Sequence, residues 1–231
     1  MPGDWLERWN FDPLLLVAMT VALMAALRLP AHRRIAPVSA VACFGLLFVS
    51  PFCALSSALF AARVVHHVLL ATVLAPLIAH GFALYWQRLP GSLTVWTAVQ
   101  ALAFWLWHAP PFYAAALSND AVFWMMQAGI TIPAAIWWAK LRTAPDAAAV
   151  ASLLAAMVLM GVLGALITFA GRALYAPHWL TTQAWGLSPL EDQQIGGLIM
   201  WAPASAVYLL AAMAVLYQSL GTTSAAPAER S

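Results

Sequence analysis

The chain has 231 residues, of which 64% are hydrophobic and only 8% are charged. A soluble domain carries roughly 25% charged residues, so this composition excludes an ordinary soluble protein and indicates an integral membrane protein. The formal net charge of +2 provides no basic surface of the kind that binds nucleic acid. We therefore expect one compact membrane domain that has the lipid bilayer, and no nucleic acid, among its partners.

Apolar segments long enough to cross a bilayer, which takes about 20 residues, recur along the chain. We predict spans over residues 13–29, 36–55, 58–86, 92–108, 121–141, 147–171 and 192–218. The predicted fold class is all-α: a polytopic membrane protein built as a bundle of about seven transmembrane helices. Residues 1–218 would form this single domain, and residues 219–231 would form a short disordered tail.

The first predicted span is expected to be a retained helix. The flank before it, MPGDWLERWNFD, carries three acids and one arginine, whereas a signal peptide begins with a positive segment and ends at a small-residue cleavage site. Asp12 is placed to cap the helix, and Pro13 suits its first position.

Charged residues are divided unevenly between the two sets of alternating loops. One set holds seven basic residues and two acids, a formal charge of +5, and the other holds two basic residues and six acids, a formal charge of −4. Cytoplasmic loops carry an excess of Lys and Arg, so the first set is predicted to be cytoplasmic. The N-terminus then lies outside the cell and the C-terminus in the cytoplasm.

The third predicted span, which contains ARVVHHVLLATVLAPLIAH, carries unusually many polar side chains: Arg63, His66, His67 and His80. Ionisable residues inside a span are costly and therefore point to function. At a rise of about 1.5 Å per residue, His66 and His67 lie about 13–15 Å below the outer end, and His80 lies about 21 Å deeper than His66. Successive residues are about 100° apart around a helix, so one of the two adjacent histidines is expected to pack against a neighbouring helix.

Further coordinating side chains are predicted near the same outer end of the bundle. His108 ends the fourth span, His178 lies in the long outer loop, and Asp192 opens the seventh span. Met126 lies about one turn inside the outer end of the fifth span. Polar and coordinating groups are therefore expected to gather in the outer half of the bundle.

Arg63 is expected to find an acidic partner. It shares a helix face with either of the adjacent histidines, and a cation at this depth must pair with an acid or extend outward to water. Asp192 is the first expected partner, Glu191 the second and Asp120 the third.

Histidines grouped in this way suit several chemistries. Imidazole binds copper, iron and zinc, and a thioether suits Cu(I). A pair of histidines on two helices can hold haem, and similar residues serve protons and quinones. The sequence has no CxxC, HExxH or nucleotide-binding loop. A metal-handling protein, a haem- or quinone-binding redox protein and a small-ion or metal transporter using Arg63 and Asp192 therefore all remain open on spacing alone.

A series of motifs resembles the CtaG family of cytochrome c oxidase assembly proteins. In chain order they are WNFDP, FAARVVHHVLL followed by AP, WLWHAPPFY, IWWAKL, LYAPHW and GLSPLEDQQIGGLIMW, and DQQIGGLIMW is the most specific. The resemblance implies a seven-spanning, non-enzymatic assembly factor for a haem-copper oxidase in the bacterial inner membrane. It further implies that copper reaches the CuB centre from the outer face, with an oxidase subunit or another copper chaperone as partner.

The resemblance also implies which residues bind copper. His67 and His108 match the family's motifs and would be copper ligands, with His66, Met126 or His178 completing the site. The family's third span resembles F-S-x-H-x-x-Q-H, so a cation stands here where its first histidine is usual. The fifth span, FWMMQAG, also lacks a usual histidine.

Two supporting roles follow from the same motifs. Asp192 matches the family and would orient a histidine or the incoming ion from behind the ligands. Small residues are expected where helices approach closely, and these are Gly161, Gly164, Gly196 and Gly197.

Overall fold

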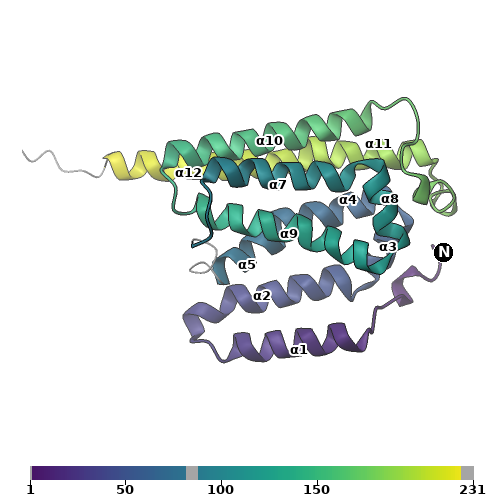
Figure 1. Ribbon diagram of the computed structural model, residues 1–231, viewed down its shortest axis with the longest axis horizontal. Helices are drawn as coiled ribbons and strands as arrows, with labels where there is room; N and C mark the ends of the chain where they lie inside the picture. The colour runs from purple at the N-terminus through teal and green to yellow at the C-terminus, as the bar shows by residue number, and fades with distance from the viewer. Residues whose placement is uncertain (1, 82–87, 225–231) are drawn as a thin grey trace, which may run out of the picture.

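A computed structural model describes residues 2–81 and 88–224, and Figure 1 shows their arrangement. In these two ranges every regular element is a helix, which confirms the all-α fold class. The α-helices are α1 (Pro13–Leu27), α2 (Ala31–Phe48), α3 (Pro51–Ala58), α4 (Phe60–Leu69), α5 (Ala75–Gly81), α7 (Leu93–His108), α8 (Pro110–Ser118), α9 (Asp120–Leu141), α10 (Asp146–Thr168), α11 (Pro189–Ile199) and α12 (Ser205–Ser224). Short 3₁₀ helices are Trp5–Glu7, Ala176–His178 and Gln183–Trp185.

The long helices lie side by side as a bundle (Figure 1). Helices α1 and α2 pack together along one edge, whereas α10 packs against α12 and α7 against α9. Helices α3 and α8 and the start of α11 lie at the same end of the bundle as the N-terminus. The predicted outer-end motifs are therefore gathered at one end.

Several helices meet the requirements of a membrane span by length and composition. Among the described residues there are four: Phe60–Gly81, Asp120–Leu141, Asp146–Thr168 and Pro189–Leu220. A fifth is possible if α2 and α3, which meet at a bend of 48°, form one span. These helices agree with a polytopic membrane protein, whereas the number of seven spans and the predicted orientation stay predictions.

Most predicted boundaries fall within a few residues of the observed helices. Asp12 caps α1 as expected: its side chain accepts a hydrogen bond from the amide of Leu15, and Pro13 takes the first helical position. Residues 82–86 of the third predicted span and residues 225–231 of the predicted tail lie outside the described residues. Helix α12 continues to Ser224, beyond the predicted end at residue 218.

Two stretches near the junctions of predicted spans form short helices. The stretch SPFCALSS forms α3, which Ser50 caps by accepting a hydrogen bond from the amide of Phe52. The stretch HAPPFYAAALSND contains α8, which begins at Pro110. Pro51 and Pro110 begin these two helices, because proline is favoured in the first helical turn, where its nitrogen needs no hydrogen-bond partner.

Two long helices contain a π-helical turn. Leu70–Leu74 joins α4 to α5, and Met200–Ala204 joins α11 to α12. The second turn contains Pro203, and Pro76 follows the first. Because proline removes a backbone hydrogen bond and crowds the preceding turn, it accounts for the local widening. The first π-helical turn starts three residues after His67, within the single span Phe60–Gly81.

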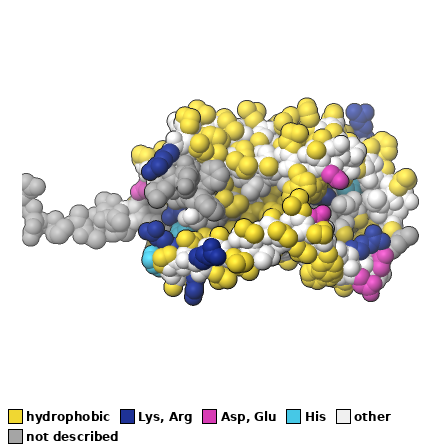
Figure 2. Space-filling model, turned by 60° about the horizontal axis from the view of Figure 1, so that its bottom comes forward, with side chains coloured by type: hydrophobic (Ala, Val, Ile, Leu, Met, Phe, Trp, Pro, Cys, Tyr) yellow, Lys and Arg dark blue, Asp and Glu magenta, His cyan; other side chains and the backbone are white. Residues whose placement is uncertain are grey.

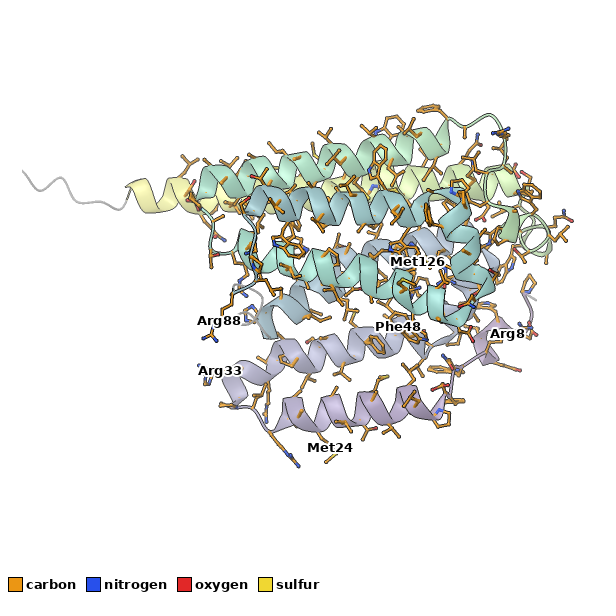
Figure 3. All side chains as sticks on the ribbon, viewed as in Figure 1. Arg8, Met24, Arg33, Phe48, Arg88 and Met126 are labelled. Carbon is orange, nitrogen blue, oxygen red and sulfur yellow. The ribbon has the colours of Figure 1, made fainter. Side chains whose placement is uncertain are left out.

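The surface agrees with a membrane environment. On the face shown in Figure 2, hydrophobic side chains cover the middle of the molecule, and charged side chains gather toward its two ends. Figure 3 places Arg33 and Arg88 at one end of the bundle and Arg8 at the other. The apolar surface includes Leu14 and Val21 of α1, which are 79% and 62% exposed.

Glycines let α10 and α11 approach closely. A methyl group added to Gly164 would lie 2.6 Å from the backbone nitrogen of Trp201 and 2.7 Å from the carbonyl oxygen of Gly197. A methyl group added to Gly196 would lie 2.7 Å from the ring of Phe60, whereas Gly161 is less tightly packed, at 3.3 Å from Ser205 Oγ. A methyl group added to Gly197 would meet Thr168 of α10. These contacts support a packing role for the predicted glycines, which stays a prediction.

Candidate functional site

The structure brings two of the predicted site residues, His67 and His108, into direct contact. His67 Nδ1 lies 3.2 Å from His108 Nε2, and both side chains are buried. The two rings meet edge to face, with centroids 5.0 Å apart. His67 comes from the last turn of α4 and His108 is the last residue of α7, so two elements far apart in sequence supply the pair.

The hydrogen bonds around the pair define where its protons lie. His108 Nδ1 is 2.7 Å from the carbonyl oxygen of Phe104, and because a carbonyl can only accept, this nitrogen carries the proton. In neutral His108, Nε2 is then an acceptor, and His67 Nδ1 donates to it. His67 Nε2 is left with a lone pair and has no hydrogen-bond partner in the described part of the chain.

His66 faces away from this pair, as the helical geometry predicted for one of the adjacent histidines. Its Nε2 lies 3.1 Å from the carbonyl oxygen of Leu47, and its ring packs against Phe48 and Phe52. Its ring centroid is 6.0 Å from that of His67. His66 is therefore held by α2 and α3, and the expectation that it completes the site with His67 and His108 is not met in this structure.

His178 belongs to a neighbouring group of aromatic residues. Its Nε2 accepts a hydrogen bond of 2.6 Å from the Tyr113 hydroxyl, and its Nδ1 lies 3.3 Å from the carbonyl oxygen of Ala58. Burial, together with the charge of Arg63, lowers the pKa of His178 to about 4, so this imidazole is neutral at neutral pH. His178 is thus engaged elsewhere and does not contact the His67–His108 pair.

Tyr175 links this aromatic group to the histidine pair. Its hydroxyl donates a hydrogen bond of 2.8 Å to the carbonyl oxygen of His108, and its ring stacks on Phe60 with centroids 3.9 Å apart. Tyr113 packs edge to face against both rings. The loop between α10 and α11, which carries LYAPHW, therefore covers the end of α7 where His108 lies.

The predicted ion pair between Arg63 and Asp192 is not formed. The Asp192 carboxylate accepts hydrogen bonds from the backbone amides of Phe60, at 2.6 Å, and Ala61, at 3.1 Å. The first amides of a helix have no partner within it, so this carboxylate is used to cap α4. Asp192 also makes no contact with His67 or His108 among the hydrogen bonds of the described residues, contrary to the expected orienting role.

Arg63 is held by groups other than acids. Its Nε donates to the carbonyl oxygen of Ser56 at 2.9 Å, and its Nη2 donates to Ser57 Oγ at 3.0 Å. The guanidinium lies 5.2 Å from the centre of the Phe123 ring. Arg63 is 1% exposed and does not extend outward to water, which was the other outcome considered for it.

Met126 is fully buried on α9, where Figure 3 labels it inside the bundle. The next residue, Gln127, is also buried, and neither its amide nitrogen nor its amide oxygen has a hydrogen-bond partner in the described ranges. Among the residues that the structure describes, no group of three or more His, Cys, Asp or Glu side chains could hold a metal ion. His67 and His108 are therefore the histidine ligands that the geometry offers together.

A comparison with protein families connects this site to a known family. The sequence profile of the cytochrome c oxidase caa3 assembly factor matches residues 14–221. The chain belongs to this family. The match covers every element from α1 through most of α12 and includes both histidines of the pair, which confirms the resemblance seen in the motifs. No curated protein and no solved structure matches the chain.

Several residues around the site of this caa3 assembly factor family member were not predicted from the sequence. Tyr113 and Tyr175 lie in the motifs WLWHAPPFY and LYAPHW, which were noted for their histidines. A tyrosine within five residues of a histidine in each of these two motifs was an available signal. Gln127 gave no such signal, because an isolated glutamine in an apolar span has no pattern that marks it as buried and unpartnered.

Proposed function

We propose that this member of the caa3 assembly factor family handles copper for a haem-copper oxidase and delivers it to the CuB centre from the outer face of the bacterial inner membrane. Family membership supports a role in cytochrome c oxidase assembly. Such factors are not typically catalytic, so the proposed role is transfer of the metal, with an oxidase subunit or another copper chaperone as partner.

The contact between His67 Nδ1 and His108 Nε2 carries the copper proposal. His67 Nδ1 and His108 Nε2, 3.2 Å apart, would bind one ion after a small separation, because metal–imidazole bonds are about 2.0–2.1 Å long. Binding requires the proton of His67 to move from Nδ1 to Nε2, which has no hydrogen-bond partner among the described residues. The Phe104 carbonyl fixes the proton of His108 on Nδ1 and so keeps its Nε2 unprotonated, as an outer partner of a ligating histidine does.

A site with two protein ligands suits a transferred copper ion. Structural zinc takes four protein ligands, and catalytic zinc takes three, whereas the described residues provide the histidine pair without a third His, Cys, Asp or Glu. An imidazole pair suits copper, and few ligands favour release to a partner. The buried surroundings of both histidines would keep water from the ion.

The alternative functions receive less support from the geometry. Haem would need its flat macrocycle between two histidines, but His67 and His108 are in direct contact. A transporter that uses Arg63 and Asp192 as a charge pair would need them to meet, and Asp192 is bound to the amides of Phe60 and Ala61 instead.

The test is the amount of Cu(I) retained per purified chain, measured in competition with a Cu(I) chelator. We expect His67→Ala and His108→Ala each to lower the Cu(I) affinity at least about tenfold and to lower assembled oxidase activity in the host. His32→Ala is the matched control, because His32 is exposed on α2. Abundance of each variant in the membrane is measured alongside.

Two results would overturn the proposal. If both alanine variants retain as much Cu(I) as the parent and support normal oxidase levels, the histidines serve packing only. If the purified protein shows a Soret band that His67→Ala removes, the pair holds haem.

A further inference from the structure

A pocket opens at the end of the bundle where α3, α8, the start of α9 and the outer loop meet. Its volume is about 350 Å³, within the range of about 300–1,000 Å³ that ligand pockets occupy. Its walls include Arg63, Leu117, Asp120 and Phe123. The pocket does not include His67 or His108, so it is separate from the proposed copper site.

Arg63 lines this pocket and has unused hydrogen-bonding capacity. Its Nε and Nη2 donate to Ser56 and Ser57, but its Nη1 has no acceptor within the described part of the chain. A guanidinium carries five N–H donors in a planar fork that matches phosphate or carboxylate oxygens. The unpartnered nitrogen is therefore the donor that an oxyanion in the pocket would use.

The charge of Arg63 is also not balanced by a neighbouring acid. Asp192 caps α4, and Glu191 bonds the backbone amide of Ser188 at 2.8 Å. Asp120 lines the pocket but is exposed, and no carboxylate of the described residues lies within 4.0 Å of the guanidinium. A buried charge without a partner is strongly unfavourable, so an anion in this pocket would compensate it.

The pocket is thus lined by two opposite charges that do not form an ion pair with each other. The buried side chain of Arg63 and the exposed carboxylate of Asp120 both line it. A simple anion would meet repulsion from Asp120, whereas a zwitterion would place its anionic group at Arg63 and its cationic group at Asp120. Ser57 Oγ, which also lines the pocket, adds a hydroxyl near the anionic end.

We propose that this pocket binds a zwitterionic phosphoester of an amino alcohol, with the phosphate at Arg63 and the ammonium group at Asp120. The lipid headgroup of phosphatidylethanolamine and free phosphoethanolamine share this chemistry. The pocket lies at the predicted outer ends of the spans, which is the level of headgroups in a bilayer.

The experiment uses the full chain, purified in detergent and stripped of lipid. Binding of phosphoethanolamine, inorganic phosphate and dioctanoyl phosphatidylethanolamine is measured by native mass spectrometry and by the shift in unfolding temperature. We expect phosphoethanolamine to bind more tightly than inorganic phosphate. A phosphatidylethanolamine affinity at least about tenfold above that of phosphoethanolamine identifies the lipid as the source, and equal affinities identify the free compound.

Three variants and a control separate the contributions. Arg63→Gln removes the cation and is expected to lower the affinity for phosphoethanolamine about tenfold or more, a loss of about 1.4 kcal/mol. Leu117→Trp keeps Arg63 but fills the pocket, and is expected to have the same effect. Asp120→Asn is expected to abolish the preference for phosphoethanolamine over inorganic phosphate. Arg172→Gln changes an exposed arginine in the outer loop and is expected to bind as the parent does.

The variants keep the proposal open to refutation even if Arg63→Gln does not fold, because Leu117→Trp and Asp120→Asn leave the buried cation in place. Unchanged affinity in both of these variants would overturn it. The absence of measurable binding of phosphoethanolamine and phosphatidylethanolamine to the parent protein would also overturn it.

Discussion

The carboxylate of Asp192 accepts a hydrogen bond of 2.6 Å from the backbone amide of Phe60, the first residue of α4. A second bond of 3.1 Å from the amide of Ala61 makes Asp192 a cap supplied by a different helix. The residue before α4, Leu59, offers no side-chain cap of its own. Helix α11 thereby fixes the start of the helix that carries His67.

Removing this cap is predicted to destabilise the protein. Asp192→Ala leaves two buried amides without an acceptor, which costs about 1–3 kcal/mol for each unsatisfied group. Asp192→Asn keeps one acceptor oxygen and is expected to cost less. The measurement is the unfolding temperature in detergent, with Glu191→Gln as control because Glu191 is exposed. An Asp192→Ala variant that melts with the parent would show that water replaces the carboxylate.

A second prediction concerns Gly164, where α10 touches α11. In Gly164→Ala the added methyl group would lie 2.6 Å from the backbone nitrogen of Trp201, and a backbone atom cannot move aside as a flexible side chain can. We expect the helices to separate and the unfolding free energy to fall by about 1–3 kcal/mol, as in overpacked cores. Gly171→Ala is the matched control, since nothing lies within 4 Å of its added methyl group. Equal unfolding temperatures for the two variants would contradict the close packing.

Much of the fold could be predicted from the sequence because the signals were local. Apolar length predicted the long helices, and Asp12 with Pro13 predicted the start of α1, since capping depends on residues adjacent along the chain. The helical period also predicted that His66 and His67 face different neighbours. These features need no knowledge of how distant segments meet.

The parts that could not be predicted depend on contacts between distant segments. The sequence suggested that Arg63 pairs with Asp192, because opposite charges at similar depth attract. It could not show that the start of α4 lies beside Asp192. There the backbone amides of Phe60 and Ala61 donate hydrogen bonds to the Asp192 carboxylate, and Arg63 does not. The contact of His67 with His108, 41 residues apart, was expected from the family's motifs, whereas their spacing alone left it open.

The predicted orientation can be tested by labelling from outside intact cells. In a background with Cys43 and Cys53, which are both free thiols, replaced by alanine, single cysteines are introduced as Arg33→Cys and Leu180→Cys. Both positions are exposed on the protein surface. A difference in labelling between the two cysteines therefore reports the side of the membrane on which each one lies. We expect a membrane-impermeant maleimide to label Leu180→Cys, and Arg33→Cys only after the membrane is permeabilised. The opposite pattern would reverse the topology and place the His67–His108 pair near the cytoplasm.

His178 predicts a loss of stability in acid. Burial lowers its pKa to about 4 in the folded protein, whereas an unfolded chain gives histidine a pKa of about 6.5. The unfolded chain therefore binds a proton more readily than the folded protein between these values. The stability that neutral His178 contributes is fully present above pH 6.5 and is lost as the pH falls toward 4, by an amount on the order of 3 kcal/mol.

The His178→Gln variant isolates this contribution, because its side-chain oxygen can still accept the hydrogen bond from the Tyr113 hydroxyl but does not titrate. We expect the unfolding temperature of the parent to fall between pH 7 and pH 4.5, and that of His178→Gln to fall less over the same range. Arg63, whose charge also lowers the pKa of His178, stays in place in both proteins. Parallel curves for the two proteins would mean that His178 is protonated without cost, and that its contact with Tyr113 does not depend on the neutral imidazole.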